Sequence, residues 1–228
     1  MKPIAISVLT ICGIEELPKH EARSVTHVLS LIDPGWPEIA AFQSFDDHHR
    51  VILHCHDIID PVPGKVMPAR DDVAAVLKFG EDLAASASDR GGQAGHLLVH
   101  CHMGVSRSTA SMLALLAQVH PNETEDRLFE RLREIRQQAW PNSVMVGHAD
   151  DLLGRGGRLT AALRRHYGHQ KKRDPGLADW MIELGRRREV EMAEDRAPSA
   201  APQELYWPGA GFARNCGVRQ WLTSGRRP

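Results

Sequence analysis

The residues with the clearest capacity for chemistry are a cysteine and an arginine with five positions between them, Cys101 and Arg107. The apolar run Leu97–Val99 comes just before them and predicts a short buried strand. The segment 109–119 follows and is apolar nearly all round, which predicts a buried helix. We therefore expect both side chains in a loop between the end of a strand and the start of a helix.

Such a loop is well suited to bind an anion. Unpaired amides at a helix N-terminus point outward, and the helix dipole favours negative charge there. The same field favours a thiolate over a thiol at Cys101. The planar fork of Arg107 can bind two oxygens of a tetrahedral oxyanion, and Gly104 allows the backbone to turn tightly beneath it. A nucleophile, an amide cradle and a cation in one loop indicate attack on phosphorus.

The run His100-Cys101-x5-Arg107-Ser108 resembles the signature loop of the cysteine-dependent protein tyrosine phosphatases, especially their small dual-specificity-like branch. The resemblance implies that Cys101 is the nucleophile and forms a cysteinyl-phosphate. It also implies that the loop binds the substrate phosphate through His102, Met103, Gly104, Val105, Ser106 and Arg107. A bare Cys-x5-Arg also resembles rhodanese-like sulfurtransferases and arsenate reductases, but the flanking His100 and Ser108 favour the phosphatase.

The oxygen that leaves phosphorus needs a proton, so a carboxylic acid should face the cysteine. The resembled family carries an aspartate on a mobile loop after the preceding strand. Asp57 ends a predicted strand and has a proline four residues later. This spacing is similar to the family's Trp-Pro-Asp-x-x-x-Pro loop, although the Trp-Pro pair is absent. We assign Asp57 as the general acid, with Asp60 as the first alternative and Asp71 or Asp72 behind it.

Two neighbours of the loop have more than one interpretation. Ser108 either donates a hydrogen bond to the cysteine sulfur, which would help it leave in the second step, or caps the helix. His100 is expected to order the loop through a backbone hydrogen bond rather than act as a base.

A metal site is the alternative from a different class of chemistry. The tripeptides 54–56 and 100–102 both read His-Cys-His and end what we expect to be neighbouring strands. Alternation puts each histidine pair on one face of its strand, so a zinc site is conceivable. A metal on Cys101 would occupy the nucleophile and leave Arg107 unexplained. We therefore predict no metal and no other cofactor.

The surrounding pattern predicts an α/β fold of the protein-tyrosine-phosphatase type, with a central, mostly parallel sheet of four to five strands flanked by helices. The predicted strands are 4–11, 26–32, 50–57 and 97–100. Asp71 and Asp72 open one helix, and Asn122 with Glu125 forms a capping-box-like start to another. A last pair of helices is expected within 143–167.

The character of the chain changes after this pair. We predict a phosphatase domain over 1–168 and a basic, partly disordered extension over 169–228. Residues 1–163 carry a net charge of −6 and residues 164–228 one of +5. Within the extension, 171–176 is expected to be a linker and 177–194 a single charged helix.

The cysteines favour a reducing, cytoplasmic setting, because they lie far apart without the spacing of a disulfide framework: Cys12, Cys55, Cys101 and Cys216. No apolar run reaches the roughly 18 residues of a membrane span. Lipid phosphatases of the resembled superfamily often carry lysines inside the loop, and this loop has none. The predicted function is hydrolysis of phosphotyrosine in a phosphorylated protein, with phosphoserine and phosphothreonine left open and no nucleic acid involved. A phosphate-binding pseudophosphatase and a sulfurtransferase are the alternatives.

Overall fold

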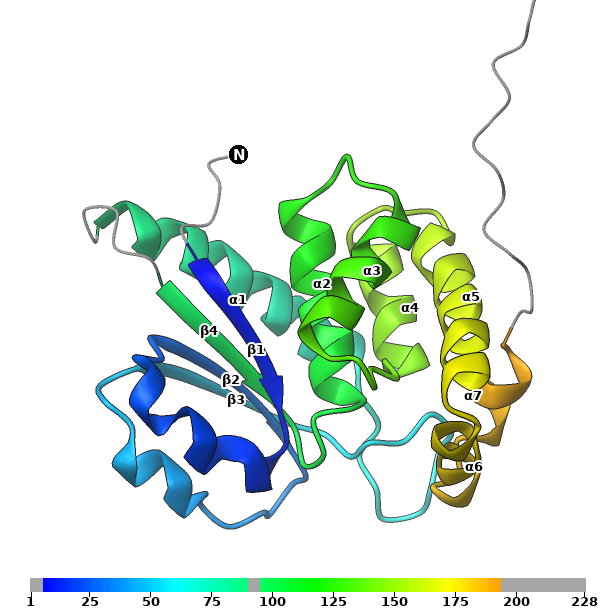
Figure 1. The fold of residues 1–228 in the computed structure, drawn as a ribbon, viewed down its shortest axis with the longest axis horizontal. Helices are drawn as coiled ribbons and strands as arrows, with labels where there is room; N and C mark the ends of the chain where they lie inside the picture. The colour runs from blue at the N-terminus through cyan, green and yellow to red at the C-terminus, as the bar shows by residue number, and fades with distance from the viewer. Residues whose placement is uncertain (1–5, 90–94, 194–228) are drawn as a thin grey trace, which may run out of the picture. The chain divides into compact units, whose positions relative to one another are not determined.

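A computed structural model describes residues 6–89 and 95–193 of the chain (Figure 1). Its centre is a sheet of four strands in the order β1-β4-β2-β3, with every pairing parallel. The strands are β1 (Ile6–Cys12), β2 (His27–Ile32), β3 (His49–His54) and β4 (Gly95–His100). The predicted α/β class with a parallel sheet and flanking helices is confirmed.

Burial follows the position of each strand in the sheet. The inner strands β2 and β4 are buried along their whole length, whereas the edge strand β3 alternates between exposed and half-buried residues. Strands buried on both faces are mostly apolar, which explains the apolar runs in the sequence. The register pairs His100 of β4 with Cys12 of β1 and with Ser30 of β2. The carboxyl ends of these three strands therefore lie together.

Helices cover both faces of the sheet (Figure 1). They are η1 (Ile14–Arg23), η2 (Ala40–Ser44), α1 (Arg70–Asp89), α2 (Arg107–Val119), α3 (Glu125–Ile135), α4 (Ser143–Leu152), α5 (Arg158–Arg173), α6 (Pro175–Glu183) and α7 (Arg187–Glu191). The short 3₁₀ helices η1 and η2 pack on one face through a small apolar cluster that includes Leu17 and Phe42. The helices α1 to α5 lie on the other face (Figure 1), where Met112 and Leu113 of the buried α2 belong to the larger core.

The predicted start of the helix after residue 121 is wrong. Helix α3 begins at Glu125 with Thr124 as its N-cap, and Asn122 lies outside it. The backbone first makes a turn, in which the Glu123 amide donates to the His120 carbonyl. That turn holds Asn122 too early in the chain to cap the helix.

The packed unit continues past residue 168, where the sequence predicts a boundary. Helix α5 runs on to Arg173, and Asp174 then caps α6 by accepting from the Leu177 amide at 3.1 Å. The single helix expected over 177–194 is wrong, because the chain turns at Gly185 with a φ of +77°, which glycine adopts without strain. Residues 194–228, for which we predict partial disorder, lie outside the described residues.

The strands that end in His-Cys-His are not neighbours, contrary to expectation, because β2 lies between β3 and β4. Within 6–89 and 95–193, no group of three or more histidine, cysteine or carboxylate side chains could hold a metal ion. No helix in these two ranges is long and apolar enough to cross a membrane.

Candidate active site

The Cys-x5-Arg loop connects the end of β4 to the start of α2, as predicted. Cys101 follows β4 directly and is only 2% exposed. Ser106 is the N-cap of α2, and Arg107 is the first residue of the helix. The loop therefore has the strand–loop–helix setting in which helix amides can face an anion.

Two glycines let this loop lie directly on the end of β1. Gly104 has a φ of +68°, and a Cβ there would come within 2.4 Å of the Cys12 carbonyl carbon. A Cβ on Gly13 would lie 2.8 Å from the His102 oxygen, which accepts a hydrogen bond from the Ile14 amide at 2.9 Å. The close approach of two backbones thus requires glycine at both positions.

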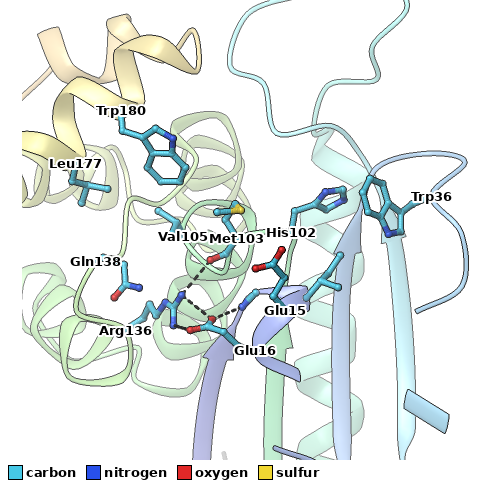
Figure 2. Close-up of a pocket in the computed structure, with 12 residues that line it drawn as sticks. Glu15, Glu16, Trp36, His102, Met103, Val105, Arg136, Gln138, Leu177 and Trp180 are labelled. Atoms are coloured by element: carbon cyan, nitrogen blue, oxygen red, sulfur yellow. Dashed lines mark hydrogen bonds and ion pairs between the residues drawn. The ribbon is translucent and has the colours of Figure 1, made fainter. Parts of the chain in front are cut away.

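Arg136, the residue after α3, supports the same part of the loop from outside (Figure 2). Its guanidinium donates to the carbonyl oxygens of Gly104 at 3.0 Å and Met103 at 3.2 Å. It also pairs with Glu16, whose other contact is the Gly13 amide at 2.7 Å. Burial raises the pKa of Glu16, but its bonds to Arg136 and Gly13 outweigh this and hold the pKa below the usual value. We call Arg136 and Glu16 the buttress of the loop.

Ser108 contacts the cysteine. Its hydroxyl oxygen lies 3.2 Å from the Cys101 sulfur, and both side chains are buried. Because Ser106 occupies the N-cap position, the geometry matches the first of the two interpretations of Ser108. Its role in a reaction stays a prediction.

His100 contacts the neighbouring strand through its side chain. Its Nε2 lies 2.6 Å from the hydroxyl of Ser30 on β2. Burial lowers the pKa of His100 to about 3, so the imidazole is neutral at physiological pH. His100 therefore fastens β4 to β2 beneath the loop.

Arg107 is held by residues from two other strand ends. Its Nη1 lies 2.7 Å from the Asp33 carboxylate and also donates to the Cys55 carbonyl oxygen. Its Nε is buried and has no partner among the described residues. Burial opposes its charge, but nearby groups, Asp57 first among them, more than offset this and raise the pKa of Arg107.

Asp33 is a residue that sequence reasoning missed. It follows β2 directly. Its amide also donates to His102 Nε2 at 3.3 Å. The available signal was its place at the carboxyl end of a parallel strand, where ligand sites form in α/β sheets.

Asp57 is brought directly onto the loop. Its Oδ1 accepts hydrogen bonds from the Ser106 hydroxyl at 2.7 Å and the Asn142 amide at 3.0 Å, and lies 2.9 Å from Arg186. Burial raises the pKa of Asp57, but the charges of Arg186 and Arg107 outweigh it and hold the pKa below its ordinary value. The carboxyl is therefore ionised at neutral pH when no anion occupies the loop.

The alternative acids lie elsewhere. Asp60 pairs with Arg188 at 3.2 Å, and both side chains are more than half exposed. Asp72 accepts from the Ala69 amide at 2.8 Å, which places it at the start of α1, and Asp71 is exposed in the same turn. Of the candidates, the structure brings only Asp57 together with the loop.

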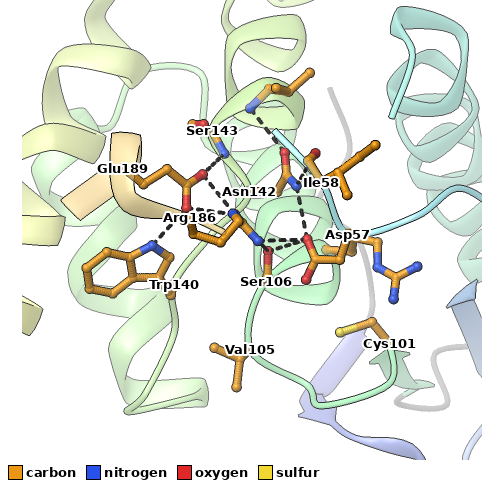
Figure 3. A network of polar contacts seen from close by, with 12 residues as sticks. Asp57, Ile58, Cys101, Val105, Ser106, Trp140, Asn142, Ser143, Arg186 and Glu189 are labelled. Carbon is orange, nitrogen blue, oxygen red and sulfur yellow. Dashed lines mark hydrogen bonds and ion pairs between the residues drawn. The ribbon is translucent and has the colours of Figure 1, made fainter. Parts of the chain in front are cut away.

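A buried ion pair from the C-terminal helices, which no sequence motif indicates, completes these contacts (Figure 3). Arg186 lies 2.7 Å from Glu189, and both side chains are at most 3% exposed. Glu189 accepts from Trp140 Nε1 at 2.9 Å and from the Ser143 amide at 2.7 Å. We call the set Asp57, Ser106, Asn142, Arg186 and Glu189 the acid network.

A groove of about 530 Å³ opens beside the loop (Figure 2). One wall is the loop itself, where Met103 is 57% exposed. The opposite wall includes Leu177 and Trp180 of α6, and Trp36 lies at one end with its ring 4.2 Å from that of His102. The groove offers largely apolar contact to whatever carries an anion into the loop.

Comparison with known proteins supports the resemblance noted in the sequence. The chain is 30% identical over 162 residues to human protein phosphatase Slingshot homolog 3; this covers 70% of the chain and 20% of the relative, so the chain spans about a fifth of that protein. No protein-family model matches.

Among solved structures, human tyrosine phosphatase-like serine/threonine/tyrosine-interacting protein has a TM-score of 0.48 and 18% identity, covering 66% of this chain and 93% of that one. Human DUSP28 has a TM-score of 0.48 and 15% identity, covering 68% and 96%. The resemblance of this chain to the cysteine-dependent protein tyrosine phosphatases, predicted from its signature loop, is confirmed.

Proposed function

We propose that the chain is a cysteine-dependent phosphatase that hydrolyses phosphotyrosine in a protein, with phosphoserine and phosphothreonine as further candidate substrates. The observation that carries the proposal is the convergence of Cys101, Arg107 and Asp57 at the end of one parallel sheet, with Ser106 joining Asp57 to the loop. The free, buried thiols of Cys12 and Cys55 are consistent with a reducing, cytoplasmic setting.

In the first step the Cys101 thiolate attacks phosphorus in line, and the bond from phosphorus to the substrate oxygen breaks. The departing oxygen takes a proton from the Asp57 carboxyl. The Arg107 guanidinium stabilises the equatorial oxygens of the transition state. The product of this step is a cysteinyl-phosphate and the free hydroxyl of the substrate.

In the second step water attacks the cysteinyl-phosphate. The Asp57 carboxylate accepts the proton of that water, the bond from sulfur to phosphorus breaks, and inorganic phosphate leaves. The departing thiolate is stabilised by a hydrogen bond from Ser108, whose oxygen is 3.2 Å from the sulfur. No metal ion or other cofactor is needed in either step.

The protonation of Asp57 follows from its surroundings. A bound phosphate dianion adds negative charge beside the carboxyl, and like charges raise a carboxyl pKa. When substrate is present, its charge therefore opposes the lowering of the Asp57 pKa by Arg186 and Arg107. Activity should fall as pH rises through the pKa that Asp57 has in this complex.

The test is an aryl-phosphate assay with Cys101→Ser. The variant should lose turnover and keep its affinity for phosphate, because the loop amides and Arg107 remain. Cys12→Ala is the matched control, since burial raises the pKa of that thiol to about 12 and leaves it protonated. The control should retain turnover.

Three results would overturn the proposal. Turnover by Cys101→Ser would exclude the cysteine as nucleophile. Phosphate binding without turnover by the natural chain would indicate a pseudophosphatase. Sulfur transfer from thiosulfate, with no vanadate-sensitive hydrolysis of aryl phosphate, would indicate a sulfurtransferase.

A further inference from the structure

The most unusual feature outside the reacting groups is the buried ion pair of Arg186 and Glu189. It comes from residues 175–193, which lie beyond the predicted phosphatase domain. A buried ion pair loses hydration, and apolar residues of similar volume often stabilise a fold as well or better. Stability is therefore a weak reason for charges at these two positions, and their contacts indicate another.

The Arg186 guanidinium divides its donors between two directions. Nη2 donates to Glu189 at 2.8 Å, whereas Nη1 donates to Asp57 at 2.9 Å and to the Ser106 hydroxyl at 2.9 Å. Figure 3 shows the side chain reaching from the C-terminal segment to Ser106 and Asp57. One planar group thus contacts the carboxylate and the loop serine together.

The position of Arg186 is itself fixed. Its backbone amide donates to the Met181 carbonyl at 2.8 Å at the end of α6, and Gly185 makes the turn before it. Glu189 is held in turn by Trp140 and Ser143. Since every partner is buried or part-buried, the guanidinium has little freedom to move away from Asp57.

These contacts also select one oxygen of the carboxyl. Oδ1 receives all three donors: Ser106, Asn142 and Arg186. Within the described part of the chain no donor makes a hydrogen bond to Oδ2. Oδ2 is therefore the oxygen left to carry the proton for the leaving group.

We propose that Arg186 is a positioning residue that holds the general acid Asp57 against the signature loop, so that residues 175–193 complete the active site. The inference rests on the proposed function, because it takes Asp57 as the acid. Arg186 takes no part in the reaction itself and acts through the orientation and charge of Asp57 and through its hydrogen bond to the Ser106 hydroxyl.

The charged and titratable groups that face Asp57 determine the pH behaviour. Among the described residues, Arg186 and Arg107 are the cations that most lower its pKa, and His102, Cys55 and Tyr167 also interact with it electrostatically. Removing Arg186 leaves one cation and so raises the Asp57 pKa. Because the acid must be protonated to act, the basic limb of the pH profile should move to higher pH.

The experiment compares Arg186→Met, Arg186→Lys and the natural chain on aryl phosphates with good and poor leaving groups. Arg186→Met should lose about 10²-fold in kcat with poor leaving groups and much less with good ones, as expected for a misplaced acid. The basic limb of its pH profile should move to higher pH. Arg186→Lys keeps the positive charge but loses the planar guanidinium. The basic limb of its pH profile should therefore stay at the same pH while kcat falls.

The matched control is Arg187→Met, which removes an exposed cation from the next position in the chain. It should change neither the limb nor the leaving-group dependence. If Arg186→Met does not fold because Glu189 is left unpaired, Arg186→Met with Glu189→Gln removes both charges and keeps an acceptor for Trp140. The double variant should show the same shift of the limb.

Failure of the inference and failure of the proposed function give different results. An active natural chain whose pH profile and leaving-group dependence are unchanged in every folded Arg186 variant overturns the inference alone. Absence of turnover in the natural chain overturns the proposed function. In that case carbon-13 NMR titration of the Asp57 carboxyl tests the contact between Arg186 and Asp57. The Asp57 pKa should be higher in Arg186→Met than in the natural chain. An equal pKa in the two chains overturns the inference.

Discussion

The signature loop is held from two sides, and the two sides differ in what they contribute. On one side the buttress of Arg136 and Glu16 binds carbonyl oxygens of Met103 and Gly104. On the other, Asp57 and Arg186 of the acid network bind the hydroxyl of the loop residue Ser106. Both sides use a buried or part-buried arginine paired with a carboxylate. Only the acid network includes a carboxylate that we expect to exchange a proton with the substrate.

This difference separates two ways in which an arginine can support an active site. Arg136 fixes the shape of the backbone that cradles phosphate, so its loss should affect every substrate alike. Arg186 fixes a proton donor, so its loss should matter most when the leaving group needs a proton. The pH profile and the dependence on the leaving group are the measurements that tell these roles apart.

The largest effect should come from the acid itself. Asp57→Asn removes the proton but keeps an oxygen for Ser106, and general acids contribute about 10²–10⁴-fold to rates. We expect a loss of this order in kcat with poor leaving groups, a much smaller loss with good ones, and disappearance of the basic limb. Asp60→Asn is the control, because Asp60 pairs with Arg188 at the exposed surface. If Asp60→Asn loses activity with poor leaving groups and Asp57→Asn does not, Asp60 is the general acid. The chemical difference between the buttress and the acid network would then disappear.

How much of this site the sequence predicts depends on how its residues are distributed along the chain. Cys101, Arg107 and Ser108 lie within eight positions, so strand and helix patterns place them correctly. Asp57 is predicted from its place after a strand and from the proline four residues later, a spacing similar to the acid loop of the resembled family.

The supporting residues are far apart from their partners along the chain. Arg186 contacts Asp57 across 129 positions, and Arg136 contacts Glu16 across 120. No local pattern encodes a partner at that separation. The charges of the α6–α7 segment resemble those of a solvated helix, so the sequence does not indicate that any of them is buried. In the fold, packing buries Arg186 and Glu189 together.

The buttress provides the second test. Arg136→Ala removes the donors to two loop carbonyls, and a displacement of about 1 Å in a reacting group costs on the order of 10²-fold. We expect kcat/KM to fall by about this factor with good and poor leaving groups alike, and the basic limb to stay where it is. Arg131→Ala is the control from α3, the helix that Arg136 follows, since Arg131 pairs with Glu123 at 2.5 Å and neither residue contacts the loop carbonyls. A movement of the basic limb in Arg136→Ala would show that the buttress also acts on the acid.

The smallest expected effect concerns Ser108, which contacts the cysteine and belongs to neither side. One hydrogen bond contributes about 1 kcal/mol, or roughly a factor of five in rate. Ser108→Ala should slow breakdown of the cysteinyl-phosphate by about that factor, so that rapid-quench mass spectrometry detects the phosphorylated chain and aryl-phosphate turnover shows a burst. Ser111→Ala is the matched control, because Ser111 is buried in the same helix and its hydroxyl has no partner among the described residues. If both variants lack a burst and lose activity equally, the Ser108 hydroxyl acts through packing in α2. If only Ser108→Ala accumulates the intermediate, the second step depends on a group that the acid network does not hold.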